Sequence, residues 1–481
     1  MSMKTPEEYV ESLKRLNPTV YIRGKLVNSV PDEPLLRPGI NAISLTYDYA
    51  LRTEYKDIMI ATSHITGKEV NRLLHINTNR DDLLKKLEMT RLLCRTTGCA
   101  QRYLTHDALN AIYETTDRID EEFNTEYHLR FLDYLEYVQI EDLTACVAMT
   151  DAKGNRSKRP HEQQDPDLYL RIVEKQEQGI VLRGVKAIVT GAPYTHEIIV
   201  LPTRAMTEND KEYAVSFAVP IDEKGIEMVS RQAGRPEDSG AELTSRYGQA
   251  TAMILFDDVF VPWERVFLAG EWQFAGSLTE AFATHHRLSC IGCRAGLGDM
   301  LIGASSLMAE ANGLDPMKVG HIREKISELI KFTESFYACG VASSVFGKET
   351  PAGNFSPEPV YANIGKLLQG LHIYDMFRIA HETSGGILVT SPYPEDMEVP
   401  SVKDRLSRYL KGREDIPADH RLKIARLLED ITASYQGGWY SVISIHGGGS
   451  PEAERMEIMR KYDLDERKSL VEKITGIRQI P

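Results

Sequence analysis

The stretch HHRLSCIGC, residues 285–293, combines imidazole and thiol side chains at helical spacing. His286, Cys290 and Cys293 stand at positions i, i+4 and i+7, which places them within roughly 60° of one another around a helix. Imidazole and thiolate are good ligands for iron and zinc, so this stripe could hold a metal. Unpaired cysteine is also among the most buried residue types, so a core histidine and two core thiols would give the same pattern. The spacing alone leaves both interpretations open.

Six cysteines are too few and too scattered to form a disulfide scaffold in a chain of 481 residues. In a reducing compartment, thiols that are close in sequence more often indicate metal or redox chemistry. Two such pairs exist here, Cys94 with Cys99 and Cys290 with Cys293. The cysteines that we expect to be core thiols are Cys94, Cys146 and Cys339.

Composition indicates an ordinary globular protein, with 42% hydrophobic and 26% charged residues in 54.2 kDa. The formal charge of −13 argues against nucleic acid or an anionic membrane as a general partner. The N-terminal residues MSMKTPEEYVESLKRL lack the apolar core of a signal peptide, and no run of about 18 apolar residues occurs. We therefore expect a cytoplasmic protein that neither binds nucleic acid nor enters a membrane.

Hydrophobic periodicity divides the chain into three regions, the first of which, residues 1–145, reads as mostly helical. Apolar residues recur at three- and four-residue intervals in 80–93 and in 105–123. The second pattern opens with Thr105-His106-Asp107, which is typical of a helix cap. Within the first pattern, LLKKLEMTRLL is expected to be a packing face and nothing more.

The second region, 146–275, contains short β-branched runs separated by Gly, Pro and Asp, which predicts an antiparallel β domain. The third region, 276–481, is helical again, and long neighbouring helices usually pack as a bundle. Helical patterns occupy 278–311, 316–347 and 418–436. The predicted fold class is α+β: a helical N-terminal domain, a central antiparallel β domain, and a C-terminal helical bundle.

Six segments together resemble one protein family, and the resemblance runs nearly from end to end. The segments are RLLCRTTGCAQRYLTHDALNA, AMTDAKGNR, DPDLYLRIVEKQEQGIVLRGVKAIVTGA, FDDVFVPWERVF, HHRLSCIGCRAGLGD and HGGGSPEAERM. They are similar to the 4-hydroxyphenylacetate 3-hydroxylase family and, within it, most similar to the 4-hydroxybutyryl-CoA dehydratases (vinylacetyl-CoA delta-isomerases). The resemblance implies an acyl-CoA-dehydrogenase-like fold and a homotetramer whose bundle helices make the main contacts.

Two chemistries occur in this family. The hydroxylases use reduced FAD, supplied by a partner flavin reductase, to insert oxygen into a phenol. The dehydratases use FAD and a 4Fe–4S cluster to eliminate water from 4-hydroxybutyryl-CoA. The resemblance to the family as a whole does not choose between these chemistries.

The resemblance also implies a flavin site. The loop that contacts the flavin in this family matches AMTDAKGNR, and the hydroxyl that bonds the isoalloxazine edge falls in AIVTGA. The segment HGGGSP resembles a turn that lets the backbone approach the cofactor. Ordinary tight turns are the alternative explanation for these motifs. The residues expected to contact FAD are Lys153, Asn155, Arg156, Thr190, Gly448 and Gly449.

For the iron–sulfur cluster, the dehydratases use Cys-x3-Cys together with His-x6-Cys. Cys99, His286 and Cys293 match three of these ligands, whereas Tyr103 stands in the place of the fourth. Cys290 in turn stands where the dehydratases have an active-site tyrosine. This reciprocal exchange favours a retained cluster ligated by Cys99, His286, Cys290 and Cys293, against the alternative of a degenerate site.

Other positions depart from both branches of the family. Two glutamates of the dehydratases align with Thr251 and Ile443, and Arg294 replaces a lysine with retention of charge. The loss of two carboxylates indicates an altered substrate or altered chemistry, because proton transfer needs bases. The residues that engage the phenol in the hydroxylases align with Leu104, Ala108 and Val147.

From this resemblance we expect an FAD-dependent dehydratase or isomerase of a short-chain hydroxyacyl-CoA, with a 4Fe–4S cluster. His286 would act as a ligand and then as a base, and Tyr103 would hydrogen-bond the substrate. The alternative enzyme is a monooxygenase that depends on reduced flavin and a flavin reductase. The alternative without catalysis is a flavoprotein scaffold with a decayed site.

Overall fold

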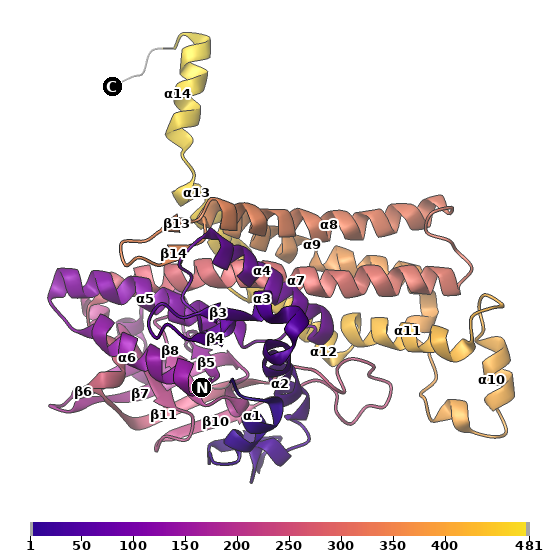
Figure 1. The fold of residues 1–481 in the computed structure, drawn as a ribbon, viewed down its shortest axis with the longest axis horizontal. Coiled ribbons are helices and arrows are strands. Elements are labelled where there is room, and N and C mark those ends of the chain that lie inside the picture. Colours follow the sequence, from indigo (N-terminus) through magenta and orange to yellow (C-terminus); the bar gives the residue numbers. More distant parts are fainter. Residues whose placement is uncertain (1–2, 478–481) are drawn as a thin grey trace.

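The computed structural model describes residues 3–477, so the outermost residues of the first and third predicted regions lie outside the description. The strands of the two larger sheets lie together on one side of the molecule, and long helices run across the other side (Figure 1). Helix α14 (Leu464–Thr475) projects away from the body, as the yellow end of the ribbon shows. No helix within 3–477 is both long enough and apolar enough to cross a membrane.

The N-terminal region contains the helices that periodicity predicted. They are α1 (Pro6–Leu13), α2 (Arg37–Leu51), α3 (Lys56–Met59), α4 (Arg80–Thr97), α5 (Tyr103–Phe123) and α6 (Tyr127–Ile140). The expected cap at Thr105 was wrong, because α5 already begins at Tyr103 and has no side-chain cap. The Thr105 hydroxyl instead donates to the carbonyl of Ala145 at 2.7 Å, which ties α5 to the first strand of the β region.

Two sheets form the β region. The six-stranded sheet has the order β2 (Lys25–Leu26), β1 (Thr19–Ile22), β10 (Ile226–Ser230), β11 (Thr251–Pro262), β7 (Gly179–Thr190), β6 (Arg171–Lys175). The four-stranded sheet has the order β12 (Val266–Ala269), β9 (Val215–Pro220), β8 (Glu197–Val200), β5 (Ala145–Ala148). The pairs β1–β10 and β5–β8 are parallel and the others are antiparallel, so the antiparallel prediction holds for most pairs only.

Burial explains why the sheets are layered in this way. Strand β10 alternates buried and exposed residues, as expected for a sheet with one face in water, whereas all four residues of β8 are buried. The four-stranded sheet is therefore the inner layer. Strands β1 and β2 lie in the region expected to be helical, and β1 joins the larger sheet through β10. The N-terminal segment thus contributes strands to the β structure beside the helices that make up most of the region.

The C-terminal region is a bundle around α7 (Trp272–Ala311), which contacts α4, α5, α8 and α9. The other helices are α8 (Gly320–Val345), α9 (Pro359–Ser384), α10 (Lys403–Tyr409), α11 (Ala418–Thr432), α12 (Tyr435–His446) and α13 (Pro451–Lys461), and β13 (Lys348–Glu349) pairs with β14 (Phe355–Ser356). Periodicity had not predicted α9. A hairpin of β3 (Ile60–Thr62) and β4 (Glu69–Asn71) completes the strands.

Candidate active site

Two glycines of α7 allow its backbone to lie directly against α4. A Cβ atom on Gly292 would lie 2.6 Å from the carbonyl oxygen of Leu87, and one on Gly296 would lie 2.5 Å from the amide nitrogen of Arg95. Such distances exclude any side chain larger than hydrogen without a backbone shift. The close approach brings the stripe 286–293 of α7 against the end of α4 and the start of α5.

Three thiols meet at this contact, and we call Cys94, Cys99 and Cys293 the three-thiol group. They are buried and lie within hydrogen-bonding reach of one another. Hydrogen bonds from Cys94 and Cys99, aided by the Arg294 guanidinium 3.4 Å from Cys293 Sγ, hold the pKa of Cys293 well below its usual value. Burial and the bond to Cys293 raise the pKa of Cys94, so this buried core thiol is also a donor in the group.

Tyr103 contacts the three-thiol group on one side and His286 on the other. Its hydroxyl lies 3.4 Å from Cys99 Sγ and also bonds Cys293, and its ring stacks on the His286 imidazole with centroids 6.0 Å apart. Burial raises the pKa of Tyr103 well above its usual value, so the phenol keeps its proton and can donate it in a hydrogen bond.

His286 and Cys290 form a second group, separate from the three thiols. His286 Nδ1 lies 2.9 Å from Oδ2 of Asp107, and Cys290 Sγ lies 3.5 Å from His286 Nε2. The fully buried Asp107 also accepts a hydrogen bond from Ser289 Oγ at 2.8 Å and pairs with the fully buried Lys86 at 2.7 Å. Burial lowers the pKa of His286, but Cys290 and Asp107 outweigh it and raise the value to about 10.

The glycine-rich turn predicted from HGGGSP packs on this second group. Gly448 and Gly449 have φ angles of 77° and 120°, which favour glycine, and Arg287 Nε donates to the carbonyl oxygen of Gly448 at 3.0 Å. A Cβ on Gly448 would lie 3.3 Å from His286 Cδ2 and 3.9 Å from Cys290 Sγ. The backbone of this turn thus packs directly on the His286 imidazole and the Cys290 thiol.

The loop after β5 carries a group of cations. Lys153 is half-buried with φ of 71°, and burial, the Arg156 charge and, less strongly, the Arg204 charge lower its pKa. Asp151 anchors the loop through a buried ion pair with Lys186 at 2.9 Å. Lys153, Arg156 and Arg204 together suit a diphosphate. The side chain of Asn155, in contrast, accepts from Ser157 N at 3.1 Å and so shapes the loop itself.

Thr190 lies at the end of β7, opposite Thr251 of β11. The next residue, Gly191, packs against the amide of Gln101, and Gln249 Nε2 donates to the carbonyl oxygen of Cys99 at 2.7 Å. The turn with the predicted flavin contact is therefore adjacent to the segment that carries Cys99 and Tyr103. The Gln101 amide is buried and has no hydrogen-bond partner within the described residues.

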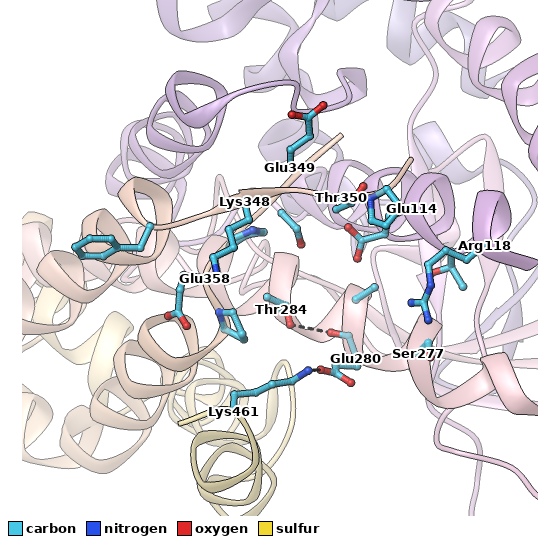
Figure 2. A pocket seen from close by; sticks show the side chains of 17 residues that line it. Glu114, Arg118, Ser277, Glu280, Thr284, Lys348, Glu349, Thr350, Glu358 and Lys461 are labelled. Atoms are coloured by element: carbon cyan, nitrogen blue, oxygen red, sulfur yellow. Dashed lines mark hydrogen bonds and ion pairs between the residues drawn. The ribbon is translucent and has the colours of Figure 1, made fainter. Parts of the chain in front are cut away.

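A cavity of about 560 Å³ opens beside the bundle, where α5, α7 and the β13–β14 hairpin meet (Figure 2). Its lining mixes both charges, including Glu114, Arg118, Glu280, Lys348 and Lys461, and Lys461 pairs with Glu280. None of the residues expected to bind flavin or metal lines it.

The four-ligand metal site stays a prediction, because its expected donors lie in two groups in this structure. Within residues 3–477, no group of three or more His, Cys, Asp and Glu side chains is arranged to hold a metal ion. Cys99 and Cys293 contact Cys94, whereas His286 and Cys290 contact each other, and the Tyr103 phenol touches both groups. A four-iron cluster takes one ligand at each corner of its core. The side chains as they lie do not fit it.

Sequence reasoning missed several residues that the structure places in or near the candidate site. Asp107 resembled a helix cap, Lys86 lay within an expected packing face, and Cys94 was expected to be a core thiol. Arg204 gave no signal of its own. The available clue was Lys86, a charged residue on an otherwise apolar face of its helix, because a buried lysine requires a partner.

Comparisons with known proteins agree with this architecture. Residues 5–268 match the family model "4-hydroxyphenylacetate 3-hydroxylase N terminal", and 275–476 match "4-hydroxyphenylacetate 3-hydroxylase C terminal". The 4-hydroxybutyryl-CoA dehydratase/vinylacetyl-CoA-Delta-isomerase of Clostridium aminobutyricum is 40% identical, with 99% of this chain and 100% of that protein covered. The oxygenase component of 4-hydroxyphenylacetate 3-monooxygenase from Thermus thermophilus is 26% identical over 97% of this chain and 96% of its own length.

A solved structure of an oxygen-tolerant archaeal 4-hydroxybutyryl-CoA dehydratase from N. maritimus has a TM-score of 0.96 to this fold at 39% identity. The match covers 100% of this chain and 96% of that one. With two adjoining family models and full-length similarity of this strength, the chain belongs to the 4-hydroxyphenylacetate 3-hydroxylase family.

Proposed function

We propose that this protein is an FAD-dependent dehydratase or isomerase that acts on a short-chain hydroxyacyl- or enoyl-CoA thioester. The observation that carries the proposal is the buried imidazole of His286, which Asp107 holds through Nδ1 at 2.9 Å so that Nε2 faces the site. A positioned imidazole suits removal or return of a proton next to a thioester carbonyl. The relative at 40% identity carries both activities in its name, which supports this substrate class.

The described residues fit FAD. Lys153, Arg156 and Arg204 would hold its diphosphate, and Thr190 and the unpartnered Gln101 amide would bond the ring edge. Gly448 and Gly449 would let backbone approach it. Bound there, FAD supplies reversible electron transfer with the substrate. The chain itself orients the thioester and moves protons at His286 Nε2, while Tyr103 donates a hydrogen bond.

The iron–sulfur cluster is not part of this proposal, because the two separate donor groups do not fit it. No step of the proposed reaction uses the cluster. Isomerisation of a but-3-enoyl thioester needs only a proton removed at carbon 2 and a proton added at carbon 4, so proton transfer by this chain's residues suffices. The isomerase reaction is accordingly the one that we expect to be stronger.

We further propose the acyl-CoA-dehydrogenase-like arrangement of three domains near the expected boundaries 1–145, 146–275 and 276–481, in a homotetramer. Exposed apolar side chains on the bundle support the assembly. They include Leu371 and Tyr374 on α9 and Leu470, Val471 and Ile474 on the projecting α14. Light scattering should give a tetramer, and removal of 463–481 should shift it toward smaller species, whereas a monomeric full-length chain would exclude this assembly.

The decisive experiment compares substrates on protein purified without air. Vinylacetyl-CoA and 4-hydroxybutyryl-CoA should be converted to crotonyl-CoA, with the first converted faster. The runner-up is a two-component monooxygenase, favoured by the poor fit to a cluster, and it predicts oxygenation of 4-hydroxyphenylacetate with a flavin reductase and oxygen. Conversion of the phenol and of neither thioester would replace the proposed function by the runner-up.

A further inference from the structure

Lys366 is a fully buried lysine of α9 whose partners lie on both sides of the glycine-rich turn 447–449. Its Nζ atom donates to the carbonyl oxygens of Ser444 at 2.9 Å and of Ile445 at 3.4 Å, both in the last turn of α12. It also pairs at 3.0 Å with Oε1 of Glu454, a fully buried residue in the first turn of α13. One ammonium group therefore ties the helix that ends before the turn to the helix that begins after it.

The turn that these two helices flank packs on the candidate active site. A Cβ atom on Gly448 would lie 3.3 Å from His286 Cδ2, and Arg287 Nε donates to the carbonyl oxygen of Gly448 at 3.0 Å. Gly448 and Gly449 have φ angles of 77° and 120°, and glycine has more backbone freedom than any other residue. Because fixing such a backbone costs conformational entropy, the turn keeps one conformation only where outside contacts hold its two ends.

Burial makes stability alone a poor explanation for this pair. The side chains of Lys366 and Glu454 are both 0% exposed, and Oε2 of Glu454 has no hydrogen-bond partner among the described residues. Two charges removed from water lose free energy of hydration that their attraction often does not recover, so a neutral pair of similar size is often as stable. What a neutral pair could not supply is the ammonium group that binds α12 and α13 at once.

We propose that the Lys366–Glu454 pair positions the turn 447–449 against the His286 imidazole for the dehydratase or isomerase reaction. This inference rests on the proposed function. Lys366 and Glu454 are positioning residues: they are fully buried, so they act through the ends of α12 and α13 and not by contact with the substrate. Holding the turn in one place keeps the reacting groups in one orientation, which supplies a large part of an enzyme's rate.

The test removes both charges together, because loss of one partner would leave the other charge buried and unpaired and could unfold the protein. Lys366→Met with Glu454→Gln keeps the approximate size of both side chains, so urea unfolding should stay near that of wild type. FAD per chain and the far-ultraviolet spectrum check that the double variant is loaded and folded. If it does not fold, Glu454→Gln alone, which keeps an acceptor for Lys366, is compared and should show both effects below at smaller size.

The first measurement is hydrogen exchange of backbone amides, followed by mass spectrometry on the FAD-loaded enzyme without substrate. Peptides that cover 444–454 should exchange about 10-fold faster or more in the double variant, because buried hydrogen bonds to a charged group are lost. Peptides from α8 should exchange as in wild type. The second measurement is turnover of vinylacetyl-CoA per bound FAD, whose kcat should fall about 10-fold with KM little changed, since orientation and not binding is impaired.

Lys325 and Glu382 provide the matched control, because this ion pair joins α8 to α9 away from the turn. Glu382 lies near the end of α9, about 24 Å along the helix axis from Lys366 at 1.5 Å per residue. Lys325→Met with Glu382→Gln should leave both the exchange at 444–454 and the turnover unchanged. Equal effects in this control would show that any lost pair between bundle helices moves the two readouts, and would overturn the inference.

The outcomes separate the inference from the proposed function. Wild-type exchange at 444–454 in the folded test variant overturns the inference, whatever its turnover. Faster exchange with wild-type kcat makes the pair purely structural, which also overturns the inference and leaves the proposed function intact. A wild type that converts neither thioester ends the proposed function, and the positioning role ends with it.

Discussion

Asp107 Oδ2 lies 2.9 Å from Nδ1 of His286, and this contact joins α5 to the centre of α7. The carboxylate is fully buried and has Lys86 as its countercharge, so its negative charge is balanced on one side and shared with the imidazole on the other. Such a carboxylate fixes both the orientation and the proton of the ring. The contact explains why a residue that resembled a helix cap lies at the centre of the site.

Replacing this carboxylate should therefore damage both function and folding. Asp107→Asn is expected to lower thioester turnover about 100-fold or more and to cost about 3 kcal/mol of unfolding free energy, because Lys86 loses its buried partner. Turnover and urea unfolding measure the two effects. Asp258→Asn, which removes an exposed pair with Arg183, should change neither. Wild-type turnover in Asp107→Asn would exclude the carboxylate from the mechanism.

The Tyr103 position provides a test of the iron–sulfur interpretation. Wild-type protein prepared without air should contain FAD but no stoichiometric iron, because the phenol touches both donor groups. Tyr103→Cys restores Cys-x3-Cys with Cys99 and should gain iron and acid-labile sulfide on reconstitution, whereas Tyr103→Phe should not. Stoichiometric iron and sulfide in wild type would restore the four-ligand site predicted from sequence.

Flavin retention should depend on the cationic loop. Thr190→Val with Arg156→Ala, and separately Arg204→Ala, should lower the FAD recovered per chain after gel filtration, since each removes a hydrogen bond or charge from the proposed contacts. Arg183→Ala is the matched control, because that arginine is exposed on β7 and pairs with Asp258. Full FAD occupancy in both test variants would show that the flavin binds elsewhere in the protein.

Two glycines with nearly equal backbone angles allow the crowding at His286 to be separated from backbone strain. Gly448 has φ of 77° and would place a Cβ 3.3 Å from His286 Cδ2, whereas Gly313 has φ of 79° and open space around it. Alanine at either position should cost about 1 kcal/mol for the left-handed conformation. Only Gly448→Ala should lower turnover as well. Equal turnover in the two variants would show that the turn leaves the imidazole undisturbed.

Acid should destabilise the protein through His196. Burial lowers its pKa from 6.5 to about 3, and its ring accepts from Thr144 N at 3.0 Å, so the folded state keeps it neutral. Between pH 6.5 and about pH 3, only the unfolded chain therefore takes up a proton on His196. Stability from this group is therefore complete above pH 6.5 and falls by about 1.4 kcal/mol per pH unit below it. Urea unfolding of His196→Gln should show a weaker acid dependence; an identical slope would contradict the assignment.

Much of the fold could be predicted from periodicity, because α4, α5, α7 and the long strands carry strong apolar patterns. Helix α9 was missed, and β1 was absorbed into a region expected to be helical. For the site, sequence placed His286, Cys290 and Cys293 on one stripe, yet the structure turns Cys293 toward Cys94 and leaves Cys290 with the imidazole. Periodicity identifies the face of a helix that is buried, but not the element that it meets.

Helix α7 is continuous from Trp272 to Ala311 and forms one rigid side of the site. One helix carries His286, Cys290, Cys293 and Arg294, so a single rigid element fixes the spacing between these residues. The facing side is built from α5, which carries Tyr103 and Asp107, and from chain reversals at Gly98 and at 447–449. A displacement of that facing side would leave the spacing of the side chains on α7 unchanged.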